Sequence, residues 1–194
     1  MGMDERLPRL TPDRLDDAQR ELHAAITGGP RSSGPQTFSL AAADGSLVGP
    51  FGLMLHVPHL GQSLQELGAA VRYLTSFTDR EREIAILTAA SELDSDFEWW
   101  AHTRIGRSVG LSDEELDGIR SGGFAQRADV DPMEAAVHEA VRLLSARESL
   151  DDPTYAGLVT VLGEVRLMEL VVLTGYYATL ALMLHVFQVG SPPA

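Results

Sequence analysis

Residues Leu167 to Phe187 form a 21-residue apolar stretch in which Glu169 is the only charged residue. This length is enough for an α-helix to cross a bilayer. However, Glu169 lies inside the stretch, His185 lies near its end, and no cluster of basic residues flanks it. We therefore expect a helix that is buried on nearly all sides, either in the protein core or at an interface between subunits.

Signals for the start of an α-helix recur along the chain. In a capping box, a serine or threonine hydroxyl and a glutamate three residues later satisfy free backbone amides. Elsewhere an N-capping residue precedes a proline. No convincing strand pattern is present. The sequence therefore predicts an all-α fold, with helices that begin near Thr11-Pro12, Thr78/Glu81, Asp94 or Ser95, Ser112/Glu115, Asp131-Pro132 and Asp152-Pro153.

The length of 194 residues and the 44% share of hydrophobic residues fit one globular domain. We divide it into an N-terminal helix (1–27), a loop (28–52), a helical core (53–190) and a tail (191–194). The loop contains six glycines and three prolines, and we expect a lid, a binding loop or a subunit clasp, or else a surface excursion. The first long core helix carries an apolar stripe of Leu60, Leu64, Leu67 and Val71.

Charge and cysteine content exclude several classes of protein. The chain has 15 basic and 28 acidic residues and a formal net charge of -13, which disfavours binding to nucleic acid and to anionic membranes. The first residues do not resemble a secretory signal, so we expect a cytoplasmic protein. The absence of cysteine excludes disulfides, thiolate nucleophiles, dithiol redox chemistry and cysteine-ligated zinc.

Glu98 and His102 are the first candidates for a catalytic site. They are four residues apart and share one face of a helix, where the carboxylate can orient the imidazole and raise its pKa for acid–base work. Glu83 lies on the preceding helix, which a short connection should fold back beside them. The alternative is a solvated ion pair or a buried structural contact.

Aromatic and basic side chains near this pair are candidates for binding a substrate. Trp99 and Trp100 lie between Glu98 and His102 and would wall a pocket, although core or interface packing is the alternative for at least one of them. Arg104 would hold a substrate carboxylate, or it pairs with one of the many acidic residues.

Histidines and tyrosines outside this helix are further candidates. His56 and His59 need a third converging ligand to bind a metal ion, so we expect no metal site. His56 is nevertheless expected to point into the pocket. Tyr176 and Tyr177 follow a glycine that permits close approach, and they are expected to line either the cavity or a subunit interface. The predicted substrate-binding residues are Trp99, Arg104, His56 and Tyr176.

The segments REREIAILTAA (80–90) and FEWWAHTRIGRSVGLSDEEL (97–116) resemble the core motif of the carboxymuconolactone decarboxylase and alkylhydroperoxidase D-like superfamily. Residues 49–72 and 169–190 agree with the same pattern, so the resemblance covers roughly residues 49–190. It implies a helical bundle of the alkylhydroperoxidase D-like type and a homo-oligomer, such as a dimer, trimer or hexamer.

The resemblance also distinguishes two branches. The peroxidase branch carries a Cys-x-x-Cys pair, which falls here on Ser95 and Glu98, together with an upstream glutamate on Glu83 and a downstream histidine on His102. The relay residues are present and the thiols are absent, so dithiol peroxidase activity is not expected. The decarboxylase branch carries Glu-x-x-x-His at this place, and its reaction is a cofactor-free loss of carbon dioxide from a γ-lactone acid.

We therefore predict a cofactor-independent carboxy-lyase for a small cyclic carboxylic acid, with His102 as acid or base and Glu98 and Glu83 as its partners. An isomerase or cyclase that uses the same residues is one alternative. A non-catalytic scaffold or small-molecule-binding protein is another, and a peroxidase with a different reductant is a third. The expected partners are the small-molecule substrate and further copies of the chain.

Overall fold

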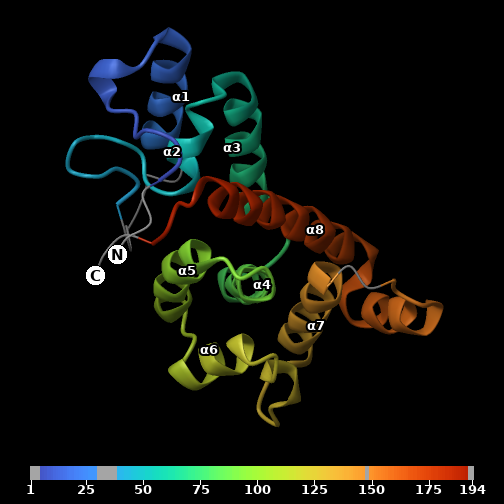
Figure 1. Cartoon of the computed structure of the whole chain (residues 1–194). Coiled ribbons are helices and arrows are strands. Elements are labelled where there is room, and N and C mark those ends of the chain that lie inside the picture. Colours follow the sequence, from blue (N-terminus) through green and yellow to red (C-terminus); the bar gives the residue numbers. More distant parts are fainter. Residues whose placement is uncertain (1–4, 30–38, 147–148, 192–194) are drawn as a thin grey trace.

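The computed structural model describes residues 5–29, 39–146 and 149–191 (Figure 1). Over these ranges the chain forms eight α-helices and no β-strand, which confirms the predicted all-α fold. Residues 30–38 of the predicted loop and 192–194 of the predicted tail lie outside the described residues. The helices are α1 (Asp17–Gly28), α2 (Pro50–Met54), α3 (Pro58–Tyr73), α4 (Asp79–Glu92), α5 (Asp96–Ser108), α6 (Asp113–Arg120), α7 (Pro132–Ala146) and α8 (Asp152–Phe187).

Helix α4 lies at the centre of the bundle, with α5, α6, α7 and α8 packed around it (Figure 1). It begins with the predicted capping box of Thr78 and Glu81. Every residue from Glu81 to Ala90 is buried, because the run that begins at Ile84 is apolar around most of the helix. A helix that is enclosed in this way holds its ionisable residues, such as Glu83, away from bulk water.

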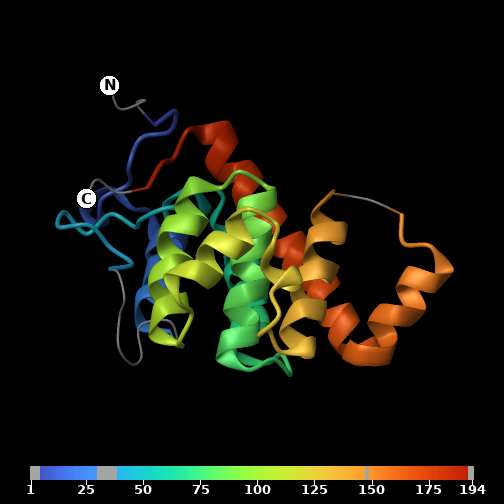
Figure 2. The same ribbon diagram turned by 90° about the horizontal axis from the view of Figure 1, so that it is seen from below.

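Helix α8 bends sharply at Gly163, whose backbone (φ 76°, ψ 160°) is not helical. Glycine adopts a positive φ at little cost, whereas other residues are strained there. The residues before the bend, 152–162, project away from the bundle, and those after it run across α4 (Figures 1 and 2). Asp151, rather than the predicted Asp152, caps the helix by accepting a hydrogen bond from the Thr154 amide.

The part of α8 after the bend has one buried face and one exposed face. Val165, Met168 and Leu182 are 71%, 63% and 63% exposed. Only 44% of the most apolar window of the helix is buried, and this is the one helix of the described residues that is long and apolar enough to cross a membrane, by length and composition only. The expectation of burial on nearly all sides is therefore wrong for a single chain, because the bundle covers only the face that carries Leu167, Leu170, Leu173, Tyr177, Leu180 and Leu184.

The apolar stripe predicted for α3 has the right period but lies mostly outside the core. Leu60 is 68% exposed and Leu67 is 41% exposed, whereas Val71 is buried. The buried face carries Gly61, Gln65 and Gly68 beside Val71, and a Cβ on Gly61 would lie 2.5 Å from the carbonyl oxygen of Met54. The close approach of α3 to the rest of the fold thus depends on small side chains, which a search for a leucine stripe does not detect.

The first α-helix begins later than predicted. Thr11 precedes only a 3-10 turn, Pro12–Arg14, and its side chain makes no capping hydrogen bond. Leu15 then takes an extended conformation and is buried. Helix α1 starts after Asp16, which forms a capping box with Gln19. The chain therefore leaves the helical conformation at Leu15, and Asp16 rather than Thr11 caps the first α-helix.

The described part of the predicted loop packs against the helices. Ala41 and Leu47 form an isolated antiparallel bridge, and Leu47 and Phe51 are buried. Helix α2 already begins at Pro50, inside the range predicted as a loop. At Gly49 (φ 63°) a Cβ would lie 2.1 Å from the ring of Phe97, so only glycine lets this segment close onto α5.

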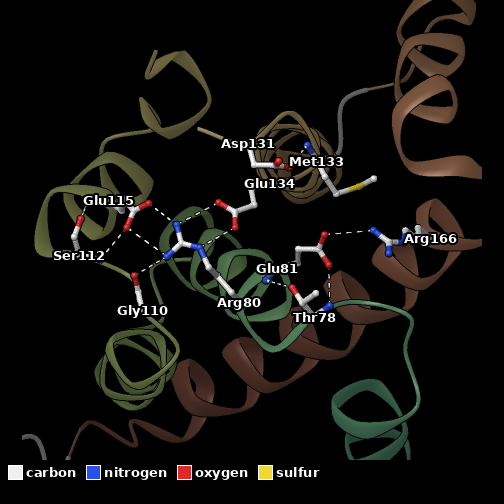
Figure 3. Close-up of polar contacts among 10 residues, drawn as sticks. All are labelled: Thr78, Arg80, Glu81, Gly110, Ser112, Glu115, Asp131, Met133, Glu134 and Arg166. Carbon is white, nitrogen blue, oxygen red and sulfur yellow. Dashed lines mark hydrogen bonds and ion pairs between the residues drawn. The ribbon is translucent and has the colours of Figure 1, made fainter. Parts of the chain in front are cut away.

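Arg80, at the start of α4, connects three helices (Figure 3). Its guanidinium donates to both carboxylate oxygens of Glu134 on α7, at 2.7 and 3.2 Å, and to Glu115 on α6. It also donates to the Gly110 carbonyl oxygen at 2.7 Å. Bidentate arginine–carboxylate pairs of this kind are among the stronger polar contacts in proteins. The cluster fixes α6 and α7 relative to the central helix.

Candidate active site

The contact between Glu83 and His102 joins α4 to α5 at the centre of the site. Glu83 Oε2 lies 2.6 Å from His102 Nδ1, and the two residues are 0% and 5% exposed. An ionised carboxylate only accepts hydrogen bonds, so Nδ1 carries a proton and donates it. This hydrogen bond fixes the orientation of the imidazole ring and leaves Nε2 as the nitrogen available for other partners.

Two further groups face Nε2 of His102. Glu98 Oε2, one helical turn earlier, lies 3.5 Å from it, and the hydroxyl of Tyr177 on α8 lies 3.4 Å from it. Both distances are longer than that of a good N–H···O hydrogen bond. The Nε2 position is therefore not held tightly by either group, and it remains available to a molecule bound beside it.

The surroundings of His102 favour the charged imidazolium. Burial lowers the pKa of His102, but the negative charge of Glu83 and hydrogen bonds with Glu83 and Glu98 outweigh burial, so the pKa lies above 6.5. Burial raises the pKa of the Tyr177 hydroxyl well above 10, and the charge of Glu98 adds to this effect. His102 therefore binds a proton more readily than a free imidazole does, and it lies beside the neutral phenol of Tyr177.

Glu83, Glu98 and His102 line a cavity of about 740 Å³, a volume typical of small-molecule sites. Much of its wall is apolar or aromatic. A small ring compound in this cavity would be largely removed from water, which strengthens its electrostatic interactions with the charged side chains. The apolar and aromatic lining includes Phe51, Phe77, Phe97, Ile105, Tyr176 and Leu180.

Two arginines that the sequence does not single out reach the same cavity, Arg72 and Arg82. Arg72 Nη1 lies 3.7 Å from Glu83 Oε1. Burial lowers the pKa of Arg72, but Tyr177 and Glu83 raise it by more, so the guanidinium stays charged. No local pattern marks Arg72, because it comes from the end of α3. Arg82 is the neighbour of Glu83 in the motif, and this position is the only feature of the sequence that could have marked Arg82 as a cavity residue.

Three buried polar atoms of cavity-lining residues have no hydrogen-bond partner among the described residues: Glu83 Oε1, Glu98 Oε1 and Arg82 Nε. An unpaired buried polar group costs about 1–3 kcal/mol, and most such groups are paired with protein, water or ligand. Glu98 Oε1 suits an O–H or N–H donor, and Arg82 Nε–H suits an oxygen acceptor. The pattern fits a ligand that carries both kinds of group.

Arg104 and His56 are not in this cavity, contrary to the prediction. They line a second cavity of about 480 Å³ with Trp100. The guanidinium of Arg104 stacks 4.2 Å from the Trp100 ring centroid and donates to the Trp100 carbonyl oxygen at 2.5 Å. His56 Nε2 lies 3.1 Å from the carbonyl oxygen of Pro8.

The geometry of α5 explains this separation. Trp100 and Arg104 follow Glu98 and His102 by two positions each. Two positions correspond to a rotation of about 200° around an α-helix. The two pairs therefore point to nearly opposite sides of α5, one into each cavity.

Tyr176 lines the cavity of His102 as predicted, and its ring meets that of Tyr177 edge to face at 5.2 Å between centroids. Trp99 does not line it. The Trp99 ring packs against the main core and lies 4.7 Å from the Arg120 guanidinium, so the packing alternative holds for this residue. In the described part of the chain, no group of three or more His, Cys, Asp or Glu residues is arranged to hold a metal ion.

The site lies within a recognisable family segment. Residues 58–142, which include Glu83, Glu98 and His102, match the model of the carboxymuconolactone decarboxylase family. The matched segment covers less than half of the chain. A comparison with curated protein sequences finds no significant match.

Two crystal structures share the fold of this chain. One is the alkylhydroperoxidase AhpD core, an uncharacterized peroxidase-related protein from Ralstonia eutropha JMP134, with a TM-score of 0.75 and 14% identity over 99% of this chain and 94% of the other. The second is a cysteine-to-alanine variant of the debrominase Bmp8 in complex with 2,3,4-tribromopyrrole, with a TM-score of 0.72 and 10% identity over the same shares of both chains. At these identities the likeness shows the fold alone.

Proposed function

We propose that this protein is a cofactor-independent lyase of the carboxymuconolactone decarboxylase family that removes carbon dioxide from a small cyclic carboxylic acid. The observation that carries the proposal is the buried imidazole of His102, which Glu83 holds at 2.6 Å through Nδ1 while Nε2 faces a cavity-lining carboxylate and phenol at longer distances. Such a group is a positioned acid with a proton to give.

In this mechanism Arg72 binds the substrate carboxylate and Arg82 donates to a second oxygen of the ring compound. When carbon dioxide leaves, the electron pair of the broken carbon–carbon bond stays on the ring carbon. An unsaturated ring delocalises the resulting negative charge. His102 Nε2–H gives its proton to that carbon. The neutral imidazole then regains a proton from solvent, so one proton is consumed and one carbon dioxide is released in each turnover.

Glu83 and Glu98 have different parts in this scheme. Glu83 keeps Nδ1 protonated and stabilises the imidazolium, and it does not touch the substrate. Glu98 Oε1 is buried and has no partner among the described residues, so it accepts a hydrogen bond from a ring hydroxyl or ring N–H. This assignment makes His102 a catalytic residue, Glu83 a positioning residue, and Glu98 a contact that selects donor-bearing rings.

An isomerase is the second candidate, and one observation favours it. The unpartnered Glu98 Oε1 and the acidic Nε2 of His102 lie at the same cavity, so one can remove a proton from a ring carbon and the other can return a proton to a different carbon. A non-catalytic scaffold is less well supported, because Glu83, Glu98 and His102 leave a cavity of about 740 Å³ beside them. The fold also accommodates a small ring, since the debrominase structure contains tribromopyrrole.

A panel of cyclic carboxylic acids and lactone acids, with and without ring hydroxyl or N–H groups, tests the proposal. In heavy water, proton NMR should show loss of the carboxylate and incorporation of one deuteron at the carbon that carried it. Deuterium exchange without loss of carbon dioxide would support the isomerase instead. The variant His102→Gln should fold and bind the same compounds without turnover. Retained turnover in this variant would overturn both catalytic proposals.

A further inference from the structure

The exposed face of α8 after the Gly163 bend follows a strict spacing. Six positions alternate steps of three and four residues, all six are exposed, and each is apolar or small except for one threonine. Such a mean step of 3.5 residues is the pattern of a seam along which two helices pack. The positions are Val165, Met168, Val172, Gly175, Thr179 and Leu182, named here the outer seam.

The outer seam is self-complementary when one copy of α8 is reversed against another. A two-fold axis midway between Val172 and Gly175 places each of these two residues against the other in the partner chain, because residue i faces j and j faces i. The same axis places Met168 against the partner's Thr179. In both of these pairs, Val172 with Gly175 and Met168 with Thr179, a larger side chain faces a smaller one. Such complementary sizes allow the two helices to pack closely.

The ends of the seam fit the same arrangement. Between residues 164 and 187 the exposed titratable residues are Glu164 and His185, one near each end. Antiparallel pairing brings Glu164 of one chain beside the partner's His185 and places Val165 against the partner's Leu182. A parallel arrangement would instead place both Glu164 side chains at one end of the seam and both His185 side chains at the other, so that the two kinds of side chain do not meet.

We propose that two copies of this chain pair antiparallel along the outer seam, through a two-fold axis between Val172 and Gly175. The occupant of this face is thus a second copy of the chain rather than a membrane. A monomer seldom leaves an apolar stripe of this length in water. Antiparallel pairing accounts for the spacing of the outer seam, for the matching of larger with smaller side chains, and for the titratable residue near each end. It does not depend on the proposed lyase activity.

Gly175 provides the sharpest test. A Cβ at this position meets nothing within 4 Å in the protomer, and glycine inside a helix is unfavourable, so Gly175→Val should leave the protomer folded. The added side chain would collide with the partner's Val172, and the two-fold axis repeats this collision once. Light scattering should show twice the 21.0 kDa chain mass for the wild type, and the dimer dissociation constant of Gly175→Val should rise at least tenfold.

A double exchange gives the matched rescue. Val172→Gly combined with Gly175→Val restores a large residue opposite a small one in both layers, and it should recover the dimer. Gly157→Val is the control, because Gly157 is exposed on the projecting part of α8 and its Cβ also meets nothing within 4 Å. A monomeric or trimeric wild type, or equal effects of Gly175→Val and Gly157→Val, would overturn the proposal.

The absence of native cysteine allows the register to be tested directly. The pair Met168→Cys and Thr179→Cys, made in one chain, should form a disulfide-linked dimer on mild oxidation. Within one chain these positions are about 16 Å apart along the helix, beyond the reach of a disulfide. Each single variant should stay unlinked. Cross-linking of Met168→Cys alone, or co-sedimentation of a monomeric wild type with lipid vesicles, would contradict the antiparallel pairing.

Discussion

Glu83 Oε2 lies 2.6 Å from Nδ1 of His102, across the interface between the central helix and α5. The two residues are 19 positions apart, so the tertiary packing of two helices, and not a local motif, sets the protonation of the imidazole. The contact is buried, where a charge pair interacts more strongly than it does in water. This relationship makes the pH behaviour of His102 the most direct measure of the site.

Replacing the Glu83 carboxylate should therefore lower the pKa of His102. Glu83→Gln removes the charge that outweighs burial, so the imidazolium should lose its proton at lower pH than in the wild type. Titration of the His102 ring by NMR, assigned with His102→Gln, measures this directly. The resonance of His23, whose Nε2 lies 3.0 Å from the Gly45 carbonyl oxygen, serves as the control. An unchanged or higher pKa would mean that Glu83 does not hold the imidazolium.

Arg72 and Arg104 provide a matched pair for substrate binding, because one lines the cavity of His102 and the other lines the second cavity. Arg72→Ala should raise KM for an acidic ring compound by about 10- to 100-fold, since a hydrogen bond to a charged group contributes about 1.5–3 kcal/mol. Arg104→Ala should change KM by less than about twofold. Steady-state kinetics of both variants decides this, and a larger effect at Arg104 would reassign the binding site.

His138 should make the protein less stable in mild acid. It is fully buried on α7 without a hydrogen-bond partner among the described residues, and burial lowers its pKa to about 4. The unfolded chain binds this proton near pH 6.5, whereas the folded chain binds it only near pH 4. Stability is therefore intact above pH 6.5 and falls as the pH drops towards 4, by at most about 3 kcal/mol.

The variant His138→Leu separates this effect from other titrating groups. It removes the buried ionisable ring and keeps a large apolar side chain beside Phe124. Urea unfolding at pH 7 and pH 4.5 should show a smaller loss of stability in the variant than in the wild type. Equal losses would show that another group controls the acid sensitivity.

Arg80→Ala should lower the free energy of unfolding by about 2 kcal/mol, because it leaves two mostly buried carboxylates without a cation. The side chains of Glu115 and Glu134 are only 18% and 14% exposed. Arg107→Ala is the control, since Arg107 and Asp113 form a pair whose side chains are 55% and 79% exposed, and its effect should stay within about 0.5 kcal/mol. Thermal and urea unfolding measure both, and equal effects would contradict the bracing role of Arg80.

The parts of the fold that depend on local chemistry were predictable. The capping boxes at Thr78 and Ser112 form as expected, because each involves residues three positions apart. Glu98 and His102 meet for the same reason, one helical turn apart. Within a single turn of helix the backbone geometry alone determines the contact.

Contacts between distant segments were not predictable in the same way. Tyr177 reaches His102 from 75 positions away, and Arg72 enters the cavity from the end of α3. Leu60 shows a further limit, since its helical period is correct but the side chain is 68% exposed. A periodic pattern shows that one face of a helix is apolar, and it does not show whether that face meets the core or another molecule.

Helix α8 has consequences for how this protein can diversify. Its Tyr176 and Tyr177 line the cavity, and its opposite face carries the outer seam. A mutation that rotates or shifts the helix to reshape the ligand site would also disturb the opposite surface. New specificity should therefore arise more readily at Phe51, Phe97 and Ile105, and directed evolution of the pocket should vary those positions while it leaves α8 unchanged.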